Sequence, residues 1–256
     1  MKKNYLGSTG ILVSKLGLGT VKLGRNTGVK YPKPFELPSD AEALNLLARA
    51  QELGINLLDT APAYGQSEER LGKLLKLAQN RSQWVLMTKA GEIFENNESS
   101  FDFSPEFLEA SLKSSLKKLG TDYIDIFLIH SNGEDEKIIQ EGALEQLQDF
   151  KKRGLIRACG MSSKTVQGGI LALEQSDLAM ITLNINYTAE MPVIEKAKAL
   201  NKGIVLKKAL GGGHVQDLEQ AFKFLSPIEP IHSIIIGTIN PKHLTDNVNY
   251  WERLGE

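Results

Sequence analysis

The run Ile124-Asp125-Ile126-Phe127-Leu128-Ile129 is almost continuously apolar and lies in the middle of the chain. A strand that is buried on both faces has this pattern, and such strands are typical of parallel sheets covered by helices. Other short runs of β-branched residues and leucine are candidate strands of the same kind. The full set of predicted strands is residues 15–19, 55–58, 84–88, 124–129, 156–161, 180–183, 204–206 and 233–236.

Amphipathic stretches separate these candidate strands. The segment Ser39-Asp40-Ala41-Glu42-Ala43-Leu44-Asn45-Leu46-Leu47 begins with polar capping residues and continues with apolar residues at helical spacing. Ser104-Pro105-Glu106 combines a cap, a first-turn proline and an early acid, and Pro241-Lys242 opens the last predicted helix. The alternation of eight strands with helices predicts a parallel (β/α)8 barrel, the TIM-barrel architecture.

An open doubly wound sheet is the main alternative architecture. It usually has five or six strand–helix units and a glycine fingerprint after its first strand, but Gly17-Leu18-Gly19 lacks the third glycine. Residues 4–12 predict an N-terminal β-hairpin that closes the barrel bottom, and residues 25–38 predict a long loop after the first strand. We see no linker or shift in composition, so we expect residues 1–256 to form a single domain.

The composition excludes several classes of partner. The chain has 30 basic and 31 acidic residues, without the basic excess typical of proteins that bind nucleic acid or anionic membranes. No apolar run approaches the roughly 20 residues of a membrane span. Cys159 is the only cysteine, which excludes an intramolecular disulfide and suits a reducing compartment. We therefore expect a cytoplasmic protein that binds neither nucleic acid nor membrane, with a monomer as the favoured state.

Four polar residues lie where chemistry is expected in this fold, at the carboxyl ends of strands and in the following loops. Asp59, Lys89 and His130 end the second, third and fourth predicted strands, and Tyr64 follows Asp59 in the next loop. A tyrosine in water has a pKa of about 10, and a buried lysine beside it would lower that pKa. Asp59 would keep Lys89 charged, and His130 would bond the substrate oxygen. The set predicts general acid–base catalysis on a carbonyl, with Tyr64 as the proton donor and a cofactor as the hydride source.

Each of these residues also has an ordinary structural interpretation. Asp59 alone would be a helix cap, Tyr64 a packing residue, Lys89 a side chain that extends to water, and His130 a structural histidine. The coordinated placement at consecutive strand ends favours the catalytic interpretation. Cys159 lies inside an apolar strand, where we expect it to fill the core.

The sequence resembles the aldo-keto reductase superfamily nearly from end to end, and that family's aspartate–tyrosine–lysine–histidine set falls on the four residues above. The motifs that carry the resemblance are Leu16-Gly17-Leu18-Gly19-Thr20, Gly54-Ile55-Asn56-Leu57-Leu58-Asp59-Thr60-Ala61-Pro62-Ala63-Tyr64-Gly65, Met87-Thr88-Lys89, Asp125-Ile126-Phe127-Leu128-Ile129-His130, Gly154-Leu155-Ile156-Arg157-Ala158-Cys159-Gly160-Met161-Ser162, Gly237-Thr238 and Asp246-Asn247. The resemblance implies a nicotinamide-dependent carbonyl reductase.

The resemblance also implies a place for the cofactor. Ser162, Ser163 and Asn184 match the residues that hold the nicotinamide carboxamide, although relatives usually carry Ser-Asn and then Gln. Lys207 matches a residue that stacks on the nicotinamide ring and is often aromatic elsewhere. The other implied contacts lie at the barrel mouth, in the glycine-rich loop for the pyrophosphate and on the last helix for the adenosine: Gly19, Thr20, Lys208, Leu210, Gly211, Gly213, Gly237, Thr238, His243, Asp246 and Asn247.

The choice between the two nicotinamide cofactors is the least defined part of this assignment. Gly237 and His243 stand where the family has a lysine and an arginine for the ribose phosphate, and Lys242 or Lys208 is the available substitute. We expect NADP, with NAD as the alternative. The expected partner is a small-molecule carbonyl substrate, in a pocket that includes Val21, Lys22 and residues 92–102.

Two other classes of function are kept as alternatives. One is a nucleotide-binding redox sensor or regulatory subunit with little turnover. The other is a metal-dependent barrel hydrolase, which the four histidines, without a His-x-His pair, disfavour. We therefore expect no metal site.

Overall fold

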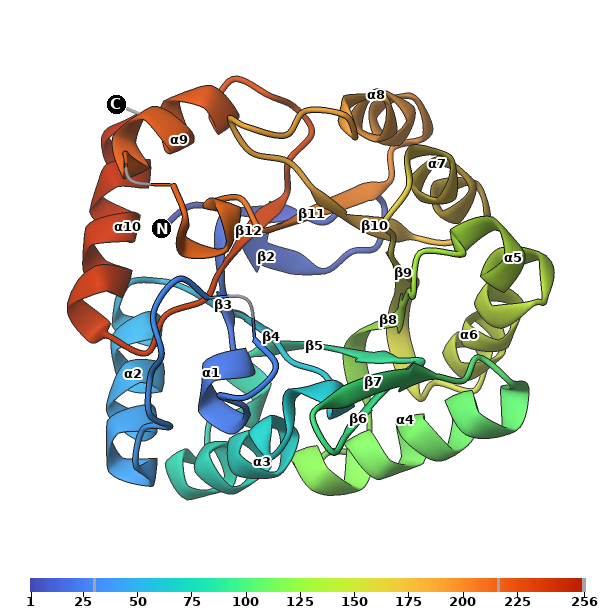
Figure 1. Ribbon diagram of the computed structural model, residues 1–256, viewed down its shortest axis with the longest axis horizontal. Helices are drawn as coiled ribbons and strands as arrows, with labels where there is room; N and C mark the ends of the chain where they lie inside the picture. The colour runs from blue at the N-terminus through green and yellow to red at the C-terminus, as the bar shows by residue number, and fades with distance from the viewer. Residues whose placement is uncertain (30, 216, 255–256) are drawn as a thin grey trace.

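Eight parallel strands close into a barrel, which confirms the predicted TIM-barrel fold (Figure 1). A computed structural model describes residues 1–29, 31–215 and 217–254. The barrel strands in chain order are β3 (Leu16–Gly19), β4 (Leu57–Asp59), β5 (Val85–Ala90), β8 (Ile124–His130), β9 (Ile156–Ser162), β10 (Leu178–Thr182), β11 (Gly203–Lys207) and β12 (Ser233–Ile236). Each strand pairs with the next in the chain, and β12 pairs with β3 to close the ring.

Helices surround the barrel on its outer side (Figure 1). They are α1 (Val21–Gly24), α2 (Asp40–Glu52), α3 (Ser67–Ala78), α4 (Pro105–Leu119), α5 (Asp135–Gln140), α6 (Ala143–Lys152), α7 (Val166–Gln175), α8 (Met191–Leu200), α9 (Leu218–Leu225) and α10 (Pro241–Arg253), with short 3-10 turns η1 (Pro62–Tyr64), η2 (Arg81–Gln83) and η3 (Gly211–Gly213). The capping signals act as predicted. Ser39 and Glu42 form a reciprocal capping box at α2, and the Ser104 hydroxyl accepts from the Phe107 amide at α4.

Burial on both faces of the strands explains the apolar run that begins at Ile124. Ile126 and Leu128 point into the barrel, where they join a core cluster with residues of the other strands. Phe127 and Ile129 point outward and join the core between the barrel and its helices. All four are fully buried, so the strand needs apolar residues at consecutive positions.

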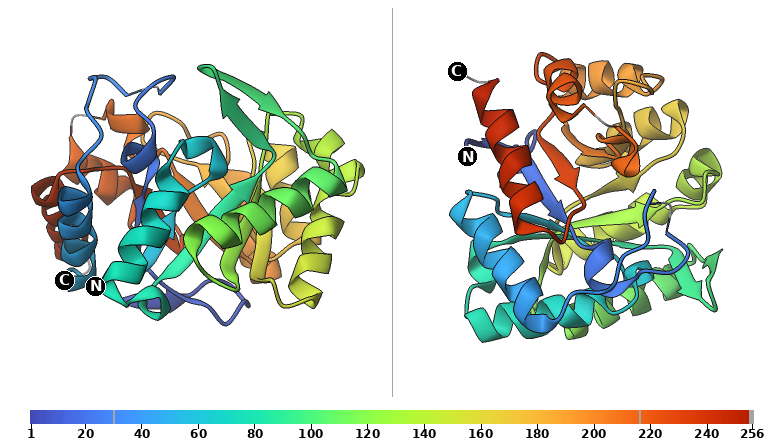
Figure 2. Two further views of the ribbon diagram at one scale, coloured as in Figure 1. Left: turned by 90° about the horizontal axis from the view of Figure 1, so that it is seen from below. Right: turned by 60° about the vertical axis from the view of Figure 1, so that its left-hand side comes forward.

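An N-terminal hairpin closes one end of the barrel, as predicted. Its strands β1 (Lys3–Tyr5) and β2 (Leu12–Ser14) pair antiparallel and lie below the barrel in Figure 2 (left). Leu6, Ile11 and Val13 are fully buried in the interior core cluster. The hairpin therefore seals the end of the barrel opposite the carboxyl ends of the strands.

A second hairpin follows β5 and was not predicted, because the acidic segment 92–102 was interpreted as a loop. It consists of β6 (Glu92–Glu95) and β7 (Glu98–Phe101). The turn residues Asn96 and Asn97 have φ values of 51° and 64°, in the left-handed region that two-residue hairpin turns require. The Asn-Asn pair was the available signal, because asparagine tolerates this conformation better than most residues.

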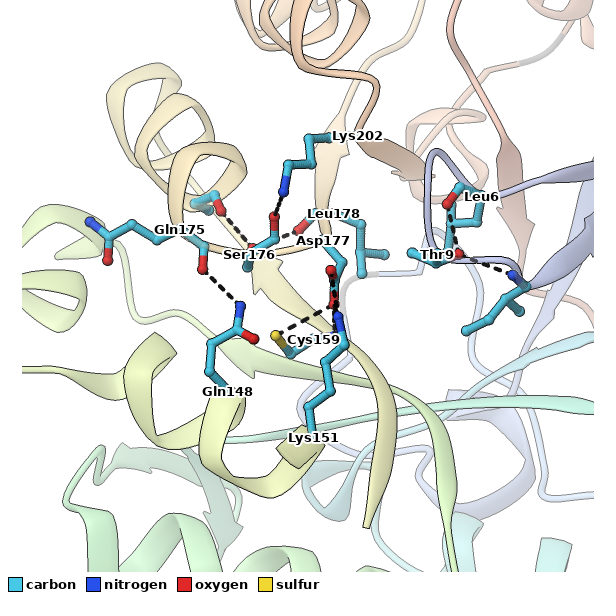
Figure 3. A network of polar contacts seen from close by, with 12 residues as sticks. Leu6, Thr9, Gln148, Lys151, Cys159, Gln175, Ser176, Asp177, Leu178 and Lys202 are labelled. Carbon is cyan, nitrogen blue, oxygen red and sulfur yellow. Dashed lines mark hydrogen bonds and ion pairs between the residues drawn. The ribbon is translucent and has the colours of Figure 1, made fainter. Parts of the chain in front are cut away.

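Polar contacts fix the chain where β9 and β10 approach the closed end of the barrel (Figure 3). Asp177 accepts from the Cys159 amide at 3.0 Å and from the Lys151 ammonium at 2.7 Å, and Lys202 donates to the Ser176 carbonyl at 2.7 Å. Burial raises the pKa of Cys159 to about 12, which keeps its thiol protonated and fits the predicted core-filling role. In the described part of the chain no helix is long and apolar enough to span a bilayer.

The hairpin plug can be tested by paired truncations. Leu6→Ala leaves a cavity at a fully buried site, so we expect the free energy of unfolding to fall by about 2–5 kcal/mol. Leu12→Ala is the control on the same hairpin, because Leu12 is 43% exposed, and it should change stability by about 0.5 kcal/mol or less. Urea denaturation measures both changes. Equal losses for the two variants would contradict the plug.

Candidate active site

A buried ion pair lies at the centre of the candidate site. The ammonium of Lys89, on β5, donates to the carboxylate of Asp59 at the end of β4 and, at 2.8 Å, to the Thr60 carbonyl. Lys89 is 1% exposed and Asp59 is 5% exposed. Because an unpaired buried charge is costly, these contacts hold Lys89 in one position as an ammonium.

The tyrosine and the histidine lie against this pair. The Lys89 nitrogen is 4.9 Å from the centre of the Tyr64 ring. The rings of Tyr64 and His130 meet edge to face, with centroids 6.1 Å apart and an interplanar angle of 87°. The structure thus brings together all four residues that the sequence nominated for catalysis.

Two glycines hold the tyrosine loop against the loop after β3. A Cβ on Gly24 would lie 2.3 Å from the Tyr64 carbonyl oxygen, and one on Gly65 would lie 2.3 Å from the Gly24 carbonyl oxygen. Gly65 also has a φ of 61°, a conformation that favours glycine. The backbone next to Tyr64 is therefore packed too closely for a side chain at either position.

The pKa of Tyr64 is raised, whereas from the sequence we expected Lys89 to lower it. Burial raises the pKa well above 10, and the negative charges of Asp59 and Glu92 raise it further. The physical reason is that burial disfavours the charged phenolate, and the carboxylate of Asp59 offsets the charge of Lys89. Tyr64 is therefore a neutral phenol that still holds its proton, the state that a proton donor needs.

Glu92 is a member of this cluster that the sequence did not single out. Its carboxylate lies 2.9 Å from Nδ1 of His130. Burial alone would raise the pKa of Glu92, but the hydrogen bond and charge of His130 hold it at about 2. Burial lowers the pKa of His130. A neutral His130 beside an ionised Glu92 carries its proton on Nδ1, which leaves Nε2 as a hydrogen-bond acceptor. The available signal was an acid three residues after Lys89, just beyond a strand end.

One wall of the site joins the β6–β7 hairpin to the loop after α1. The Arg25 guanidinium lies 3.1 Å from the centre of the Phe94 ring and donates to the Ala63 carbonyl at 3.0 Å. The Lys22 ammonium, on α1, lies 4.1 Å from the centre of the ring of Tyr31, which is farther along this loop. The predicted loop has no regular helix or strand where it is described, and its residue Lys30 lies outside the described residues.

The proposed carboxamide positions, Ser162, Ser163 and Asn184, lie at or just after the ends of β9 and β10, and Lys207 at the end of β11 lies next to them. The Lys207 ammonium donates to the Ser162 hydroxyl at 2.8 Å and to the Ser163 carbonyl at 2.5 Å. The Asn184 amide donates to the Lys208 carbonyl at 3.1 Å, next to the same strand end. These residues therefore surround one point at the barrel mouth.

Thr20 and Ser163 are proposed cofactor contacts whose side chains are fully buried. The Thr20 hydroxyl is fully buried and donates to the Asp59 carbonyl at 2.9 Å, so it ties β4 to the end of β3 at Gly19. The Ser163 hydroxyl lies near Gly169 of α7, on the helix side of the barrel wall. The Thr20 backbone is also bonded within the fold, because its N–H donates to the Asp59 carbonyl at 2.9 Å and its carbonyl accepts from the Ser67 hydroxyl at 3.0 Å. The Ser163 hydroxyl is buried and has no hydrogen-bond partner among the described residues.

The glycine-rich loop after β11 has the backbone that close approach to a ligand requires. Gly211, Gly212 and Gly213 have φ values of 58°, 68° and 94°, conformations that favour glycine, and they follow Leu210 at the barrel mouth. Successive amides in such turns form concave anion-binding surfaces. In this loop the Gly211 and Gly213 amides donate to the Lys208 and Leu210 carbonyls at 2.8 and 2.9 Å, and a pyrophosphate contact here stays a prediction.

The last helix carries the proposed adenosine contacts. Thr238, just after Gly237, accepts from the Asn240 amide, and Asn240 caps α10. His243 is exposed in the first turn, where a phosphate could reach it. Asp246 is paired with Lys242 at 2.8 Å, and Asn247 is 4% exposed with a side-chain oxygen that accepts no bond from the described residues. The donor and acceptor set fits a dinucleotide, with fewer fixed cations than a ribose phosphate prefers.

Metal ligation was also considered. Within residues 1–29, 31–215 and 217–254, no three or more His, Cys, Asp and Glu side chains come together as a metal-binding group.

Comparison with known proteins assigns the family. The sequence profile of the Aldo/keto reductase family matches residues 15–227, and the chain belongs to this family. A Pseudomonas aeruginosa protein assigned to the aldo-keto reductases has a similar structure, with a TM-score of 0.92, 45% identity and coverage of 99% of this chain and 95% of its own. A holo structure of an aldo-keto reductase from Bacillus halodurans has a TM-score of 0.83 and 25% identity, and covers 98% of this chain and 91% of its own.

Curated relatives are similar over part of their length. The aldo-keto reductase YhdN of Bacillus subtilis is 34% identical over 169 residues, which is 65% of this chain and 48% of that protein. The NADH-specific methylglyoxal reductase of Escherichia coli is 34% identical over 178 residues, which is 64% of this chain and 52% of that protein. The match thus spans about half of each relative.

The Glu92–His130 contact can be tested by titration. Glu92→Gln keeps an acceptor for Nδ1 but removes the negative charge, so we expect the pKa of His130 to fall. The matched control is Glu95→Gln, which removes an exposed acid from the same strand and should leave that pKa unchanged. NMR of the imidazole protons against pH measures both. An unchanged His130 pKa in Glu92→Gln would refute the assignment.

Proposed function

We propose that the protein reduces a small aldehyde or ketone to its alcohol with a nicotinamide cofactor, and that Tyr64 donates the proton. The observation that carries the proposal is the set of contacts around Lys89, which is bonded to Asp59 and lies 4.9 Å from the centre of the Tyr64 ring. Membership of the aldo-keto reductase family supports the reaction class. The proposal favours an enzyme over a regulatory nucleotide-binding subunit because the acid and its stabilising cation are in contact.

The proton transfer follows from the charges of the site. The cofactor supplies the hydride that the carbonyl carbon receives. Tyr64 passes its hydroxyl proton to the carbonyl oxygen as negative charge develops there, and becomes a phenolate. Lys89 stabilises that phenolate, and Asp59 keeps Lys89 an ammonium. Water then returns a proton to Tyr64.

In this proposal His130 accepts a hydrogen bond from the ligand and does not donate one. With its proton directed at Glu92, it offers Nε2 as an acceptor. The product hydroxyl can donate to this nitrogen once the substrate oxygen has taken the proton from Tyr64. In this tautomer His130 binds the product hydroxyl rather than the substrate carbonyl.

NADP is the cofactor we propose, with a modest preference over NAD. His243 is exposed at a position that the family resemblance assigns to the ribose phosphate, whereas Lys242 is paired with Asp246. The name of the Escherichia coli relative as an NADH-specific enzyme shows that NAD use occurs among similar proteins. We further propose a cytoplasmic monomer whose substrate pocket lies between α1 and the β6–β7 hairpin.

Tyr64→Phe tests the proton donor. Phenylalanine keeps the ring and its packing but removes the hydroxyl, so we expect turnover of an aldehyde to fall by about 10²-fold or more. Cofactor affinity, measured by fluorescence quenching, should stay close to the wild-type value. The matched control is Tyr5→Phe, because Tyr5 is 61% exposed on the N-terminal hairpin. Full activity in Tyr64→Phe would rule out this assignment.

His243→Arg tests the cofactor preference. We expect wild-type protein to prefer NADP(H) by about one to two orders of magnitude, and a permanent guanidinium to increase that preference. Dissociation constants for both cofactors, in wild type and in His243→Arg, measure this. Equal affinities in wild type that the arginine leaves unchanged would place His243 away from the ribose.

A further inference from the structure

Lys207 is a second lysine at the barrel mouth, and its environment differs from that of Lys89. Lys89 is bonded directly to the carboxylate of Asp59. Among the described residues, no carboxylate oxygen lies within ion-pairing distance of Lys207, whose hydrogen bonds go to the neutral oxygens of Ser162 and Ser163. The positive charge of Lys207 is therefore not cancelled by a contacting partner.

Glu190 is the acid whose charge acts most strongly on Lys207, and its side chain is buried. Glu190 is 1% exposed, and one of its oxygens accepts from the Thr182 amide at 3.2 Å. Its other oxygen is buried and accepts no bond from the described residues. Glu190 thus lowers the cost of burying Lys207 from a distance, without neutralising it at the mouth.

We infer that Lys207 makes the site distinguish the two redox states of the nicotinamide, by favouring the reduced ring over the oxidised ring. The inference rests on the proposed cofactor site, in which Ser162 and Ser163 hold the carboxamide. An ammonium has three donors, and Lys207 uses two of them on these serines, which leaves a third N–H for a ligand. The charge consequently lies beside the ring that changes charge in the reaction.

The discrimination follows from electrostatics. The oxidised nicotinamide ring carries a positive charge and the reduced ring is neutral, so only the oxidised ring is repelled by Lys207. The site would therefore bind the reduced cofactor more tightly and release the oxidised cofactor faster. An aromatic residue at this position stacks on either ring and carries no such charge.

The preference for the reduced ring should weaken as pH rises, whether Lys207 or Glu190 titrates first. Burial lowers the pKa of Lys207 to about 7, and burial raises the pKa of Glu190 to about 7. As pH rises, the site loses the charge of Lys207 or gains that of Glu190, and both changes favour the oxidised ring. The other groups that act on Lys207 are Lys208, Asp135 and Lys89, and Lys207 in turn acts on His130.

The experiment measures dissociation constants for NADP⁺ and NADPH by fluorescence, with NAD⁺ and NADH in parallel. We expect wild type to bind the reduced form more tightly, and Lys207→Met to shrink the oxidised-to-reduced ratio of dissociation constants by about tenfold. Lys207→Arg keeps the charge and should keep the ratio. Lys202→Met is the matched control, because Lys202 lies just before β11, at the other end of the strand, and donates to the Ser176 carbonyl.

A wild-type titration needs no variant, since the same ratio should fall between pH 6 and pH 8. The ribose phosphate titrates in both forms of the cofactor and cancels in the ratio. If Lys207→Met weakens both forms equally, or if the wild-type ratio is independent of pH, Lys207 only ties β9 to β11 and the inference is wrong. If wild type binds neither form of either dinucleotide, the proposed function fails together with the inference.

Discussion

Lys89 carries a positive charge into a position with 1% of its surface exposed, and the carboxylate of Asp59 is the group that makes this burial tolerable. The rest of the site is arranged around that pair. Burial and the negative charges of Asp59 and Glu92 keep the pKa of Tyr64 raised, so its phenol stays protonated. A lysine without its aspartate would be a poor stabiliser, since burial would drive it toward the neutral amine.

Much of the fold was readable from the sequence because the barrel repeats one simple pattern. Strands such as Ile124–His130 are buried on both faces and so are apolar at successive positions, a signal that needs no tertiary information. Strand ends were less certain. Asp59 and His130 belong to their strands in the structure, although a polar side chain there looks like the start of a loop.

The finer parts of the site depend on contacts between distant segments. Nothing local in the sequence says that Glu92 bonds His130, or that Lys207 bonds Ser162 and Ser163. The sign of the Tyr64 pKa shift was likewise mispredicted, because it depends on the balance between burial and the Lys89–Asp59 pair. Residue types and strand-end positions indicate which groups meet, whereas their charge states follow from the packed structure.

The close approach of Gly24 and Gly65 divides the site into a fixed part and an adaptable part. The tyrosine loop has no room to shift or to accept side chains, so it cannot reshape itself around different substrates. The neighbouring β6–β7 hairpin, which Arg25 joins to the tyrosine loop, has an exposed tip. Changes to the hairpin tip should therefore alter which compounds the proposed site accepts, because its length and side chains can vary while the contacts around Tyr64 stay intact.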